Sequence, residues 1–228
     1  MAYVAFADIM LDLRLYALVD PERANGLALD ELARRVAKGG ATLVQLRDKH
    51  GSTRRLVEEG RAIRHALGQT GVPLLINDRV DVALAAQADG VHVGQDDMAV
   101  EDARRLLGRE AIIGLSVKTV AQAQAAPVEL LDYVAIGGVF ATASKDNPDP
   151  PVGTDGLRAI AAAVRARAPR LPICAIAGID HANASSVIAA GADGVAVISA
   201  LSMAADPTAA ARDLRGVVDQ ALARRAGG

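Results

Sequence analysis

The sequence predicts an α/β fold, a (β/α)8 TIM barrel in which eight parallel strands alternate with helices. The first observation is a series of eight short apolar segments, at residues 14–19, 41–49, 73–78, 90–95, 112–116, 133–138, 172–178 and 194–199. The second is that these segments end in polar, charged or glycine-rich residues, and such barrels carry their chemistry at the carboxyl ends of the strands. The third is the length of 228 residues, which is close to the roughly 250 of one barrel.

Apolar residues recur at helical spacing between the strand segments. They do so around Leu32, around Ile63 and around Val218, so each of these regions predicts a helix with one buried face. Ser52 precedes the second region as a candidate N-cap. The interval between the third and fourth strands is the exception, because residues 79–87 leave room for only a short helix.

The strand segments are continuous apolar runs, which is typical of parallel strands covered on both faces. A doubly wound sheet would also explain such runs, but it predicts a glycine-rich turn after the first strand, where residues 19–23 read VDPER. No linker or charge block divides the chain. We therefore expect a single barrel domain over residues 1–228, with 1–13 as an N-terminal extension and 144–153 as a long loop after the sixth strand.

Composition excludes several classes of partner. With 25 basic and 27 acidic residues the net charge is −2, so no global field attracts nucleic acid or a membrane surface. Residues 1–13 lack the pattern of a signal peptide, and no apolar run approaches the roughly 18 residues of a transmembrane helix. The single Cys174 lies in an apolar strand and is most simply a small core residue. We expect a soluble, cytoplasmic protein.

Three successive strand ends carry groups suited to an anion and its metal. Gln45, Arg47 and Lys49 end the second predicted strand, and two cations with an amide suit a phosphate or diphosphate. Residues 77–78 (Asn-Asp) end the third strand, and residues 96–97 (Asp-Asp) follow the fourth. Adjacent strands lie roughly 4.8 Å apart, so these carboxylates could share one Mg2+ ion, although Asp and Asn are also common helix caps.

The remaining polar strand ends indicate a second anion site. Residues 177–180 and 197–200 follow the seventh and eighth strands, where barrels often bind a phosphate on backbone N–H groups. Lys145 adds a cation from the loop after the sixth strand, Ser116 adds a hydroxyl from the fifth, and His92 ends the fourth. The sequence contains no Walker loop, nucleophile elbow or Cys/His metal spacing. Two anion sites in one barrel predict an enzyme that joins or exchanges two phosphorylated small molecules.

These residues resemble those of a known family. Five segments are similar, in the same order over residues 14–201, to thiamine phosphate synthases: QLRDK at 45–49, IND at 76–78, GVHVGQDD at 90–97, the Thr142/Ser144/Lys145 loop and GADGVAVISAL at 191–201. The resemblance implies a barrel transferase that condenses 4-amino-2-methyl-5-(diphosphooxymethyl)pyrimidine with 4-methyl-5-(2-phosphooxyethyl)thiazole. The products would be thiamine monophosphate and pyrophosphate, formed by an Mg2+-assisted dissociative substitution.

The resemblance also implies roles for individual residues. The pyrimidine diphosphate would be held by Gln45, Leu46, Arg47, Asp48, Lys49, Asn77 and Lys145, with Ser116 near the ring. The thiazole phosphate would be held by Thr142, Ser144, Gly178, Ile198 and Ser199, and Ala143 would be a further substrate-binding residue. Asp78 and Asp97 would bind the metal, with Asp97 preferred to Asp96. The catalytic residues would be Arg47, Lys49, Ser116 and Lys145.

Three positions depart from the family pattern. Ala141 and Ser144 stand where the family commonly has Pro and Thr, and Lys118 stands where His is common. Two other interpretations stay open. A thiazole tautomerase would share the fold but needs a well-placed acid/base such as His, and a non-catalytic sensor would bind thiazole phosphate or thiamine phosphate without turnover. Formation of a homo-oligomer also stays open.

Overall fold

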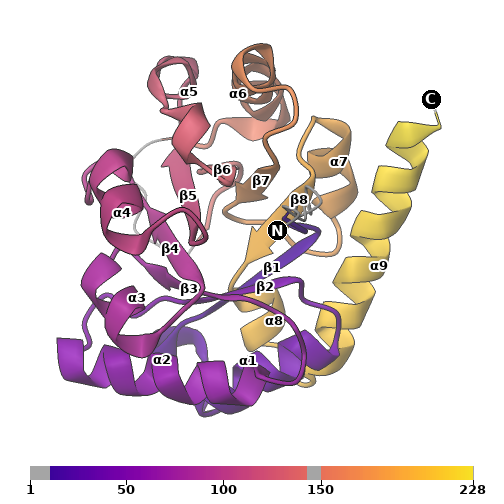
Figure 1. The fold of residues 1–228 in the computed structure, drawn as a ribbon. Coiled ribbons are helices and arrows are strands. Elements are labelled where there is room, and N and C mark those ends of the chain that lie inside the picture. The colour runs from indigo at the N-terminus through magenta and orange to yellow at the C-terminus, as the bar shows by residue number, and fades with distance from the viewer. Residues whose placement is uncertain (1–10, 143–149, 228) are drawn as a thin grey trace, which may run out of the picture.

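The computed structural model describes residues 11–142 and 150–227. Eight strands close into one barrel in chain order, each parallel to both of its neighbours, which confirms the predicted fold class (Figure 1). The strands are β1 (Leu15–Val19), β2 (Leu43–Leu46), β3 (Leu74–Asn77), β4 (Gly90–Val93), β5 (Ile112–Val117), β6 (Tyr133–Ile136), β7 (Ile173–Ile176) and β8 (Gly194–Val197).

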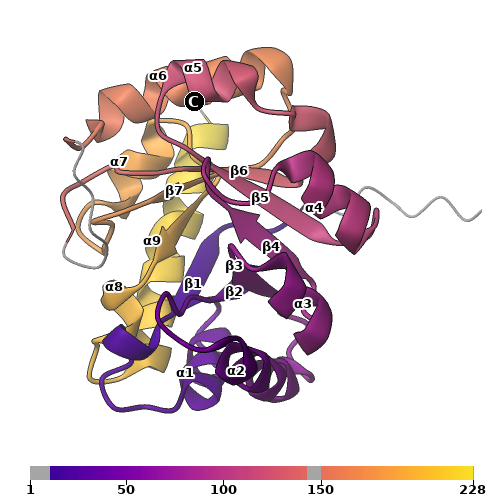
Figure 2. The same ribbon diagram turned by 90° about the vertical axis from the view of Figure 1, so that its left-hand side faces the viewer.

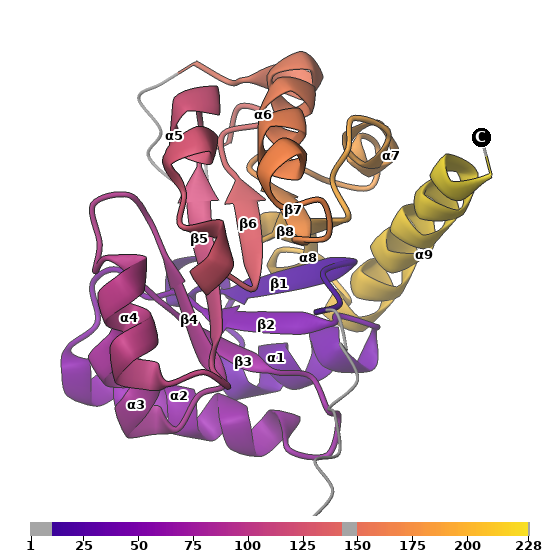
Figure 3. The same ribbon diagram turned by 45° about the horizontal axis from the view of Figure 1, so that its top comes forward.

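Helices surround the strands. They are α1 (Leu29–Lys38), α2 (Thr53–Leu67), α3 (Val80–Ala86), α4 (Val100–Leu107), α5 (Val120–Ala125), α6 (Gly153–Arg167), α7 (Ala184–Ala189), α8 (Ser199–Ser202) and α9 (Pro207–Ala226), with the 3-10 turns η1 (Pro21–Arg23) and η2 (Val128–Leu130). Figure 2 shows α1 and α2 on one side of the barrel and α5 and α6 on the opposite side. The long α9 packs against α1 and α7 and completes the ring (Figure 3).

Local sequence signals account for where several elements begin and end. Ser52 caps α2, since its hydroxyl accepts a hydrogen bond from the N–H of Arg55 at 3.4 Å. The short helix expected within 79–87 is α3. The second predicted strand was too long, because β2 ends at Leu46. Its neighbour β1 ends at Val19, whose carbonyl accepts from the N–H of Arg47, so the residues beyond continue as a loop on the carboxyl rim.

Alternation along the strands divides the buried residues between two cores. In β1, Leu15 and Val19 belong to the larger core, which also contains helix residues such as Leu32. Tyr16 and Leu18, which alternate with them, pack instead with buried residues of other strands. The smaller core therefore fills the barrel interior, and its other buried members are Leu13, Leu43, Leu75, Tyr133, Ala135, Cys174, Ala196 and Ile198. This placement confirms Cys174 as a core residue.

The amino ends of the strands are joined in pairs by a repeated contact, which we call the pair clamp. In each clamp, the residue just before an even-numbered strand has a side-chain oxygen that accepts a hydrogen bond. The donor is the backbone N–H of a residue near the start of the odd-numbered strand that precedes it in the chain. The four clamps are Thr42 on Leu15 (3.2 Å), Asp89 on Leu74 (2.7 Å), Asp132 on Ile113 (2.7 Å) and Asp193 on Ile173 (2.9 Å). Each clamp residue also donates its own N–H to the carbonyl of the same partner.

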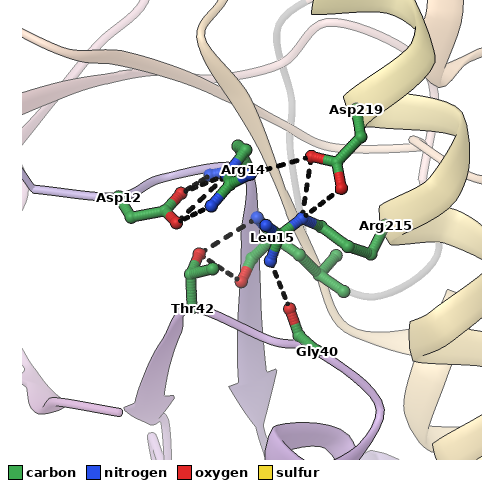
Figure 4. Close-up of polar contacts among 7 residues, drawn as sticks. All are labelled: Asp12, Arg14, Leu15, Gly40, Thr42, Arg215 and Asp219. Carbon is green, nitrogen blue, oxygen red and sulfur yellow. Dashed lines mark hydrogen bonds and ion pairs between the residues drawn. The ribbon is translucent and has the colours of Figure 1, made fainter. Parts of the chain in front are cut away.

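The first clamp lies beside a group of ion pairs that ties α9 to β1 (Figure 4). Arg14 pairs with Asp12 at 2.6 Å and with Asp219 of α9 at 3.2 Å. Arg215, also on α9, pairs with Asp219 at 2.9 Å and donates to the carbonyl of Gly40 at 2.9 Å. Because β1 and α9 belong to opposite ends of the chain, these contacts help to close the barrel.

Asp193→Ala is expected to lower the free energy of unfolding by about 1–3 kcal/mol, because the N–H of buried Ile173 loses its side-chain acceptor. Arg165 and Arg225 also pair with Asp193, but their side chains are 31% and 36% exposed, so solvent screens these pairs. Asp193→Asn keeps an acceptor oxygen and should retain most of the stability. Urea denaturation measures the free energy of unfolding of both variants, provided that the dependence of this free energy on urea concentration is unchanged. Equal losses for Ala and Asn would show that the charge matters and the clamp does not.

Candidate active site

A cavity opens at the carboxyl ends of the strands, where the sequence places the site. Its volume is about 160 Å³, close to that of engineered cavities of about 150 Å³ that bind benzene, so it suits one heteroaromatic ring. The predicted site residues that line it are Gln45, Arg47, Asn77, Ser116, Thr142, Gly178, Ile198 and Ser199. These residues come from the rims of β2, β3, β5, β6, β7 and β8. The structure therefore brings the two predicted halves of the site onto one cavity.

Arg47 is held in the cavity wall by a buried carboxylate. Its guanidinium pairs with Asp20, which directly follows β1 and is 2% exposed. The other oxygen of Asp20 accepts the N–H of Glu22 at 2.9 Å and so caps η1. Both oxygens are thus engaged, and the guanidinium is fixed at the edge of the cavity. Such a fixed fork suits two oxygens of a diphosphate.

A cluster of opposite charges lies beside the cavity at the ends of β3 and β4. Lys49 pairs with Asp78 at 2.5 Å, and the amide of Asn77 donates to the same Asp78 oxygen at 2.7 Å. Asp97 shares a hydrogen bond with Asp78 and accepts the N–H of Gly94 at 2.7 Å. Asn77 lines the cavity and so connects the cluster to it.

The two carboxyl groups of this cluster repel each other. Partial removal from water, the hydrogen bond with Asp78 and the charge of Asp78 raise the pKa of Asp97, while the Gly94 N–H and Lys49 act in the opposite direction. Asp78 also has a φ of 61°, and its N–H donates to the carbonyl of His92 at 2.8 Å. A left-handed Asp that faces a second carboxylate is a strained arrangement, and strain of this kind gathers at functional sites.

The floor of the cavity is a chain of hydrogen bonds inside the barrel. The amide of Gln45 donates to the hydroxyl of Tyr16, which lies 2.9 Å from the hydroxyl of Tyr133. That hydroxyl is 2.8 Å from Nδ1 of His92, and Nε2 of His92 is 2.8 Å from the hydroxyl of Ser116. We call these five residues the floor relay. They come from five different strands, so the relay crosses the barrel.

The opposite wall is formed by backbone. Gly178 has a φ of +64°, and a Cβ there would lie 2.4 Å from the carbonyl oxygen of Ala141. Glycine is therefore required for the loops after β6 and β7 to approach each other. Ile198 and Ser199 line the cavity where β8 leads into α8. Exposed backbone and a hydroxyl are the groups that bind a phosphate without a cation.

Some predicted residues do not line the cavity. Leu46 is buried in the larger core, on the outer face of β2. The carboxylate of Asp48 accepts the N–H groups of His50 and Gly51 at 2.9 and 2.8 Å and so shapes the turn before α2. Residues Ala143, Ser144 and Lys145 lie outside the described residues.

Sequence reasoning missed Asp20, Tyr16 and Tyr133. The chain has only three tyrosines, and two of them are in predicted strands, which was a usable signal. A polar aromatic residue in an apolar strand needs a partner for its hydroxyl when it is buried. Asp20 carried no such signal, because an acidic residue after a strand more often caps a turn.

The fold is that of a barrel enzyme, a class that carries its chemistry at the carboxyl rim of the strands, where this cavity lies. The family model described as thiamine monophosphate synthase matches residues 15–201. The chain is 56% identical to the thiamine-phosphate synthase of Agrobacterium fabrum, over 94% of this chain and 98% of that protein. It is 49% identical to that of Moorella thermoacetica, over 91% and 96%. The chain therefore belongs to the thiamine monophosphate synthase family, which is a family of transferases.

A solved structure supports the same assignment. The thiamine phosphate pyrophosphorylase from Pyrococcus furiosus superposes with a TM-score of 0.80 at 36% identity, covering 93% of this chain and 98% of that one. Among the described residues, no helix has both the length and the apolar character needed to cross a membrane.

Proposed function

We propose that the protein condenses the diphosphooxymethyl-pyrimidine with the phosphooxyethyl-thiazole to give thiamine monophosphate and pyrophosphate. The observation that supports this most is that one cavity has Arg47 in one wall and the backbone of Gly178 with Ser199 in another, while the ion pair of Lys49 with Asp78 lies beside it. A diphosphate and a monophosphate need these two different sites. Family membership supplies the reaction class.

In the proposed reaction, the bond between the pyrimidine methylene carbon and the diphosphate oxygen breaks first. The electron pair leaves with pyrophosphate, and the thiazole nitrogen then donates its lone pair to the methylene carbon. Charge therefore develops on the diphosphate, next to Arg47 and Lys49. Fixed cations that face a developing charge lower the barrier more than they strengthen substrate binding.

The donor set at Asp78 and Asp97 fits Mg2+. Two facing carboxyl groups that repel each other when both are ionised are suited to a hard cation, and Mg2+ usually takes one or two carboxylates and completes its shell with substrate phosphates. Residues 11–142 and 150–227 contain no group of three or more His, Cys, Asp or Glu side chains that would hold a metal by themselves. When bound at Asp78 and Asp97, the ion would neutralise charge on the leaving diphosphate.

On the other wall, Thr142, Gly178, Ile198 and Ser199 would hold the thiazole phosphate. The adjoining residues Ala143, Ser144 and Lys145 remain predictions, with Lys145 as a further cation for the diphosphate. The two other interpretations of the sequence receive no support from the comparisons. The tautomerase requires an acid/base on the fifth strand's loop, where this chain has Lys118.

One assay tests the proposed function. The purified protein is mixed with both substrates and Mg2+, and pyrophosphate and thiamine monophosphate are measured together. We expect the two products in equal amounts, with no pyrophosphate release when the metal is chelated. Tight binding of both ligands without product would instead indicate a sensor. Proton exchange on the thiazole alone would indicate a tautomerase.

A further inference from the structure

We infer that Tyr16, Tyr133 and His92 are positioning residues that set the hydrogen-bonding polarity of the cavity floor. They make Gln45 present an acceptor and Ser116 a donor. The floor then selects a heteroaromatic ring that carries an N–H donor and a lone-pair acceptor, as an aminopyrimidine does. This inference deepens the proposed function and rests on it for the identity of the ring.

The three residues are locked in place by packing as well as by hydrogen bonds. The rings of Tyr16 and Tyr133 meet edge to face, with centroids 5.8 Å apart, and the ring of His92 stacks on Tyr133 at 5.6 Å. Both tyrosines are fully buried in the barrel interior, and His92 is 8% exposed. None of the three hydroxyl or imidazole groups can therefore turn without repacking the barrel.

Each tyrosine has one proton to donate. Burial raises the pKa of Tyr16 and of Tyr133 well above the ordinary value, so both phenols are neutral at physiological pH. A neutral phenol donates one hydrogen bond and accepts others. The direction of one hydrogen bond in the relay consequently decides the direction of the next.

The donor-to-acceptor order of the relay is set at Gln45, whose amide N–H donates to the Tyr16 oxygen. The Tyr16 proton is then directed to Tyr133, and the Tyr133 proton to Nδ1 of His92. With Nδ1 as the acceptor, the neutral imidazole carries its proton on Nε2 and donates it to Ser116. In this order every buried proton of the relay has an acceptor, and the order follows from the Gln45 amide that donates to Tyr16.

The two ends of the relay offer the ligand opposite hydrogen-bonding groups, an acceptor at Gln45 and a donor at Ser116. The Gln45 side chain is 1% exposed, and its Oε1 has no hydrogen-bond partner within the described parts of the chain. Ser116, which already accepts from His92, has its own proton left to donate. Both residues line the cavity, so an incoming ring meets an acceptor at Gln45 and a donor at Ser116.

The opposite polarity would need a coordinated change. The Gln45 amide would have to turn over, both phenol protons would reverse, and His92 would move its proton to Nδ1. The floor would then present the Gln45 amine and the Ser116 lone pairs, which suit a ring that bears a carbonyl oxygen. Sites built to bond a given polar group reject analogues without it by as much as about 10⁴–10⁵-fold, because buried groups are left unpaired.

Tyr133→Phe tests the relay, since it removes the central hydroxyl and keeps the ring. The readout is the ratio of kcat/KM for the aminopyrimidine diphosphate to that for the analogue in which oxygen replaces the amino group. We expect a ratio of at least about 100 in the parent protein, falling below about 10 in the variant. Cys174→Ala, which alters packing in the same interior core but removes no hydrogen bond of the relay, should leave the ratio unchanged.

The outcomes separate the inference from the proposed function. If the parent protein forms no product from the aminopyrimidine, the proposed function fails. If it does form product and Tyr133→Phe leaves the ratio unchanged, the inference fails. A ratio that falls equally in Cys174→Ala would reduce the role of Tyr133 to packing and would also overturn the inference.

A second measurement is made on the parent protein and needs no substrate. Nitrogen NMR of the imidazoles distinguishes the two neutral tautomers, and His92→Gln identifies the His92 signal. We expect His92 in the Nε2–H form alone, and the exposed His50, His65 and His181 serve as references for a solvated imidazole. A signal from the Nδ1–H form, or from a doubly protonated ring, would overturn the inference whether or not the enzyme turns over.

Discussion

Asp78→Asn is expected to lower kcat by about 10²–10³-fold. The metal that would balance the charge developing on the diphosphate loses one of its two carboxylate ligands. Asn is nearly the same size and tolerates the left-handed φ of 61° at this position, so the backbone after β3 should be retained. The Mg2+ concentration for half-maximal rate should rise as well. Steady-state rates of pyrophosphate release over a range of Mg2+ measure both effects.

Asp96→Asn is the matched control for this prediction. Asp96 is adjacent to Asp97 and exposed, and the sequence alone left either one open as the ligand. The carboxylate that faces Asp78 is that of Asp97, so the Asp96 variant should keep a near-normal rate and Mg2+ dependence. If the two variants lost activity equally, or if Asp78→Asn kept the parent rate, the metal would have to lie elsewhere.

Arg47→Met is expected both to abolish most activity and to destabilise the fold by about 3–5 kcal/mol. The loss of activity follows because the variant lacks the guanidinium group that would bind the diphosphate. The loss of stability follows from Asp20, which is 2% exposed and would keep a buried charge without its counterion. Chemical denaturation and the condensation assay report the two effects separately.

The double variant Asp20→Asn/Arg47→Met separates the loss of activity from the loss of stability. Asn can still accept the N–H of Glu22, so η1 should keep its cap while the buried charge disappears. We expect most of the stability to return and the activity to stay lost. Recovery of activity in the double variant would contradict a direct role for Arg47 on the diphosphate.

The sequence predicts the barrel well, and it predicts that polar residues gather at a common rim, because parallel strands place their carboxyl ends there. Gln45, Asn77 and Ser116 meet at one cavity for this reason. Individual contacts within the rim are harder to predict. Leu46 and Asp48 lie within the same motif as Arg47, yet alternation turns Leu46 to the outer core, and a local turn uses Asp48.

The floor relay was beyond sequence reasoning for a different reason. Tyr16 and Tyr133 are 117 residues apart, and only closure of the barrel with its observed register brings their hydroxyls together. Asp20 similarly depends on the register between β1 and β2, which aligns Val19 with Leu46 and so places Asp20 beside Arg47. Such contacts require the register of several strands at once, which no single motif specifies.

The pair clamps also bear on how the chain folds. Each clamp connects residues only 15 to 27 positions apart, and each joins an odd strand to the even strand that follows it. The loops that they close are short, so their entropic cost is small, and contacts of low sequence separation form early. We therefore expect four strand–helix–strand modules to gain structure early. We expect the slow step of folding to be the docking of these modules, above all of β8 and α9 onto β1, which joins the two ends of the chain.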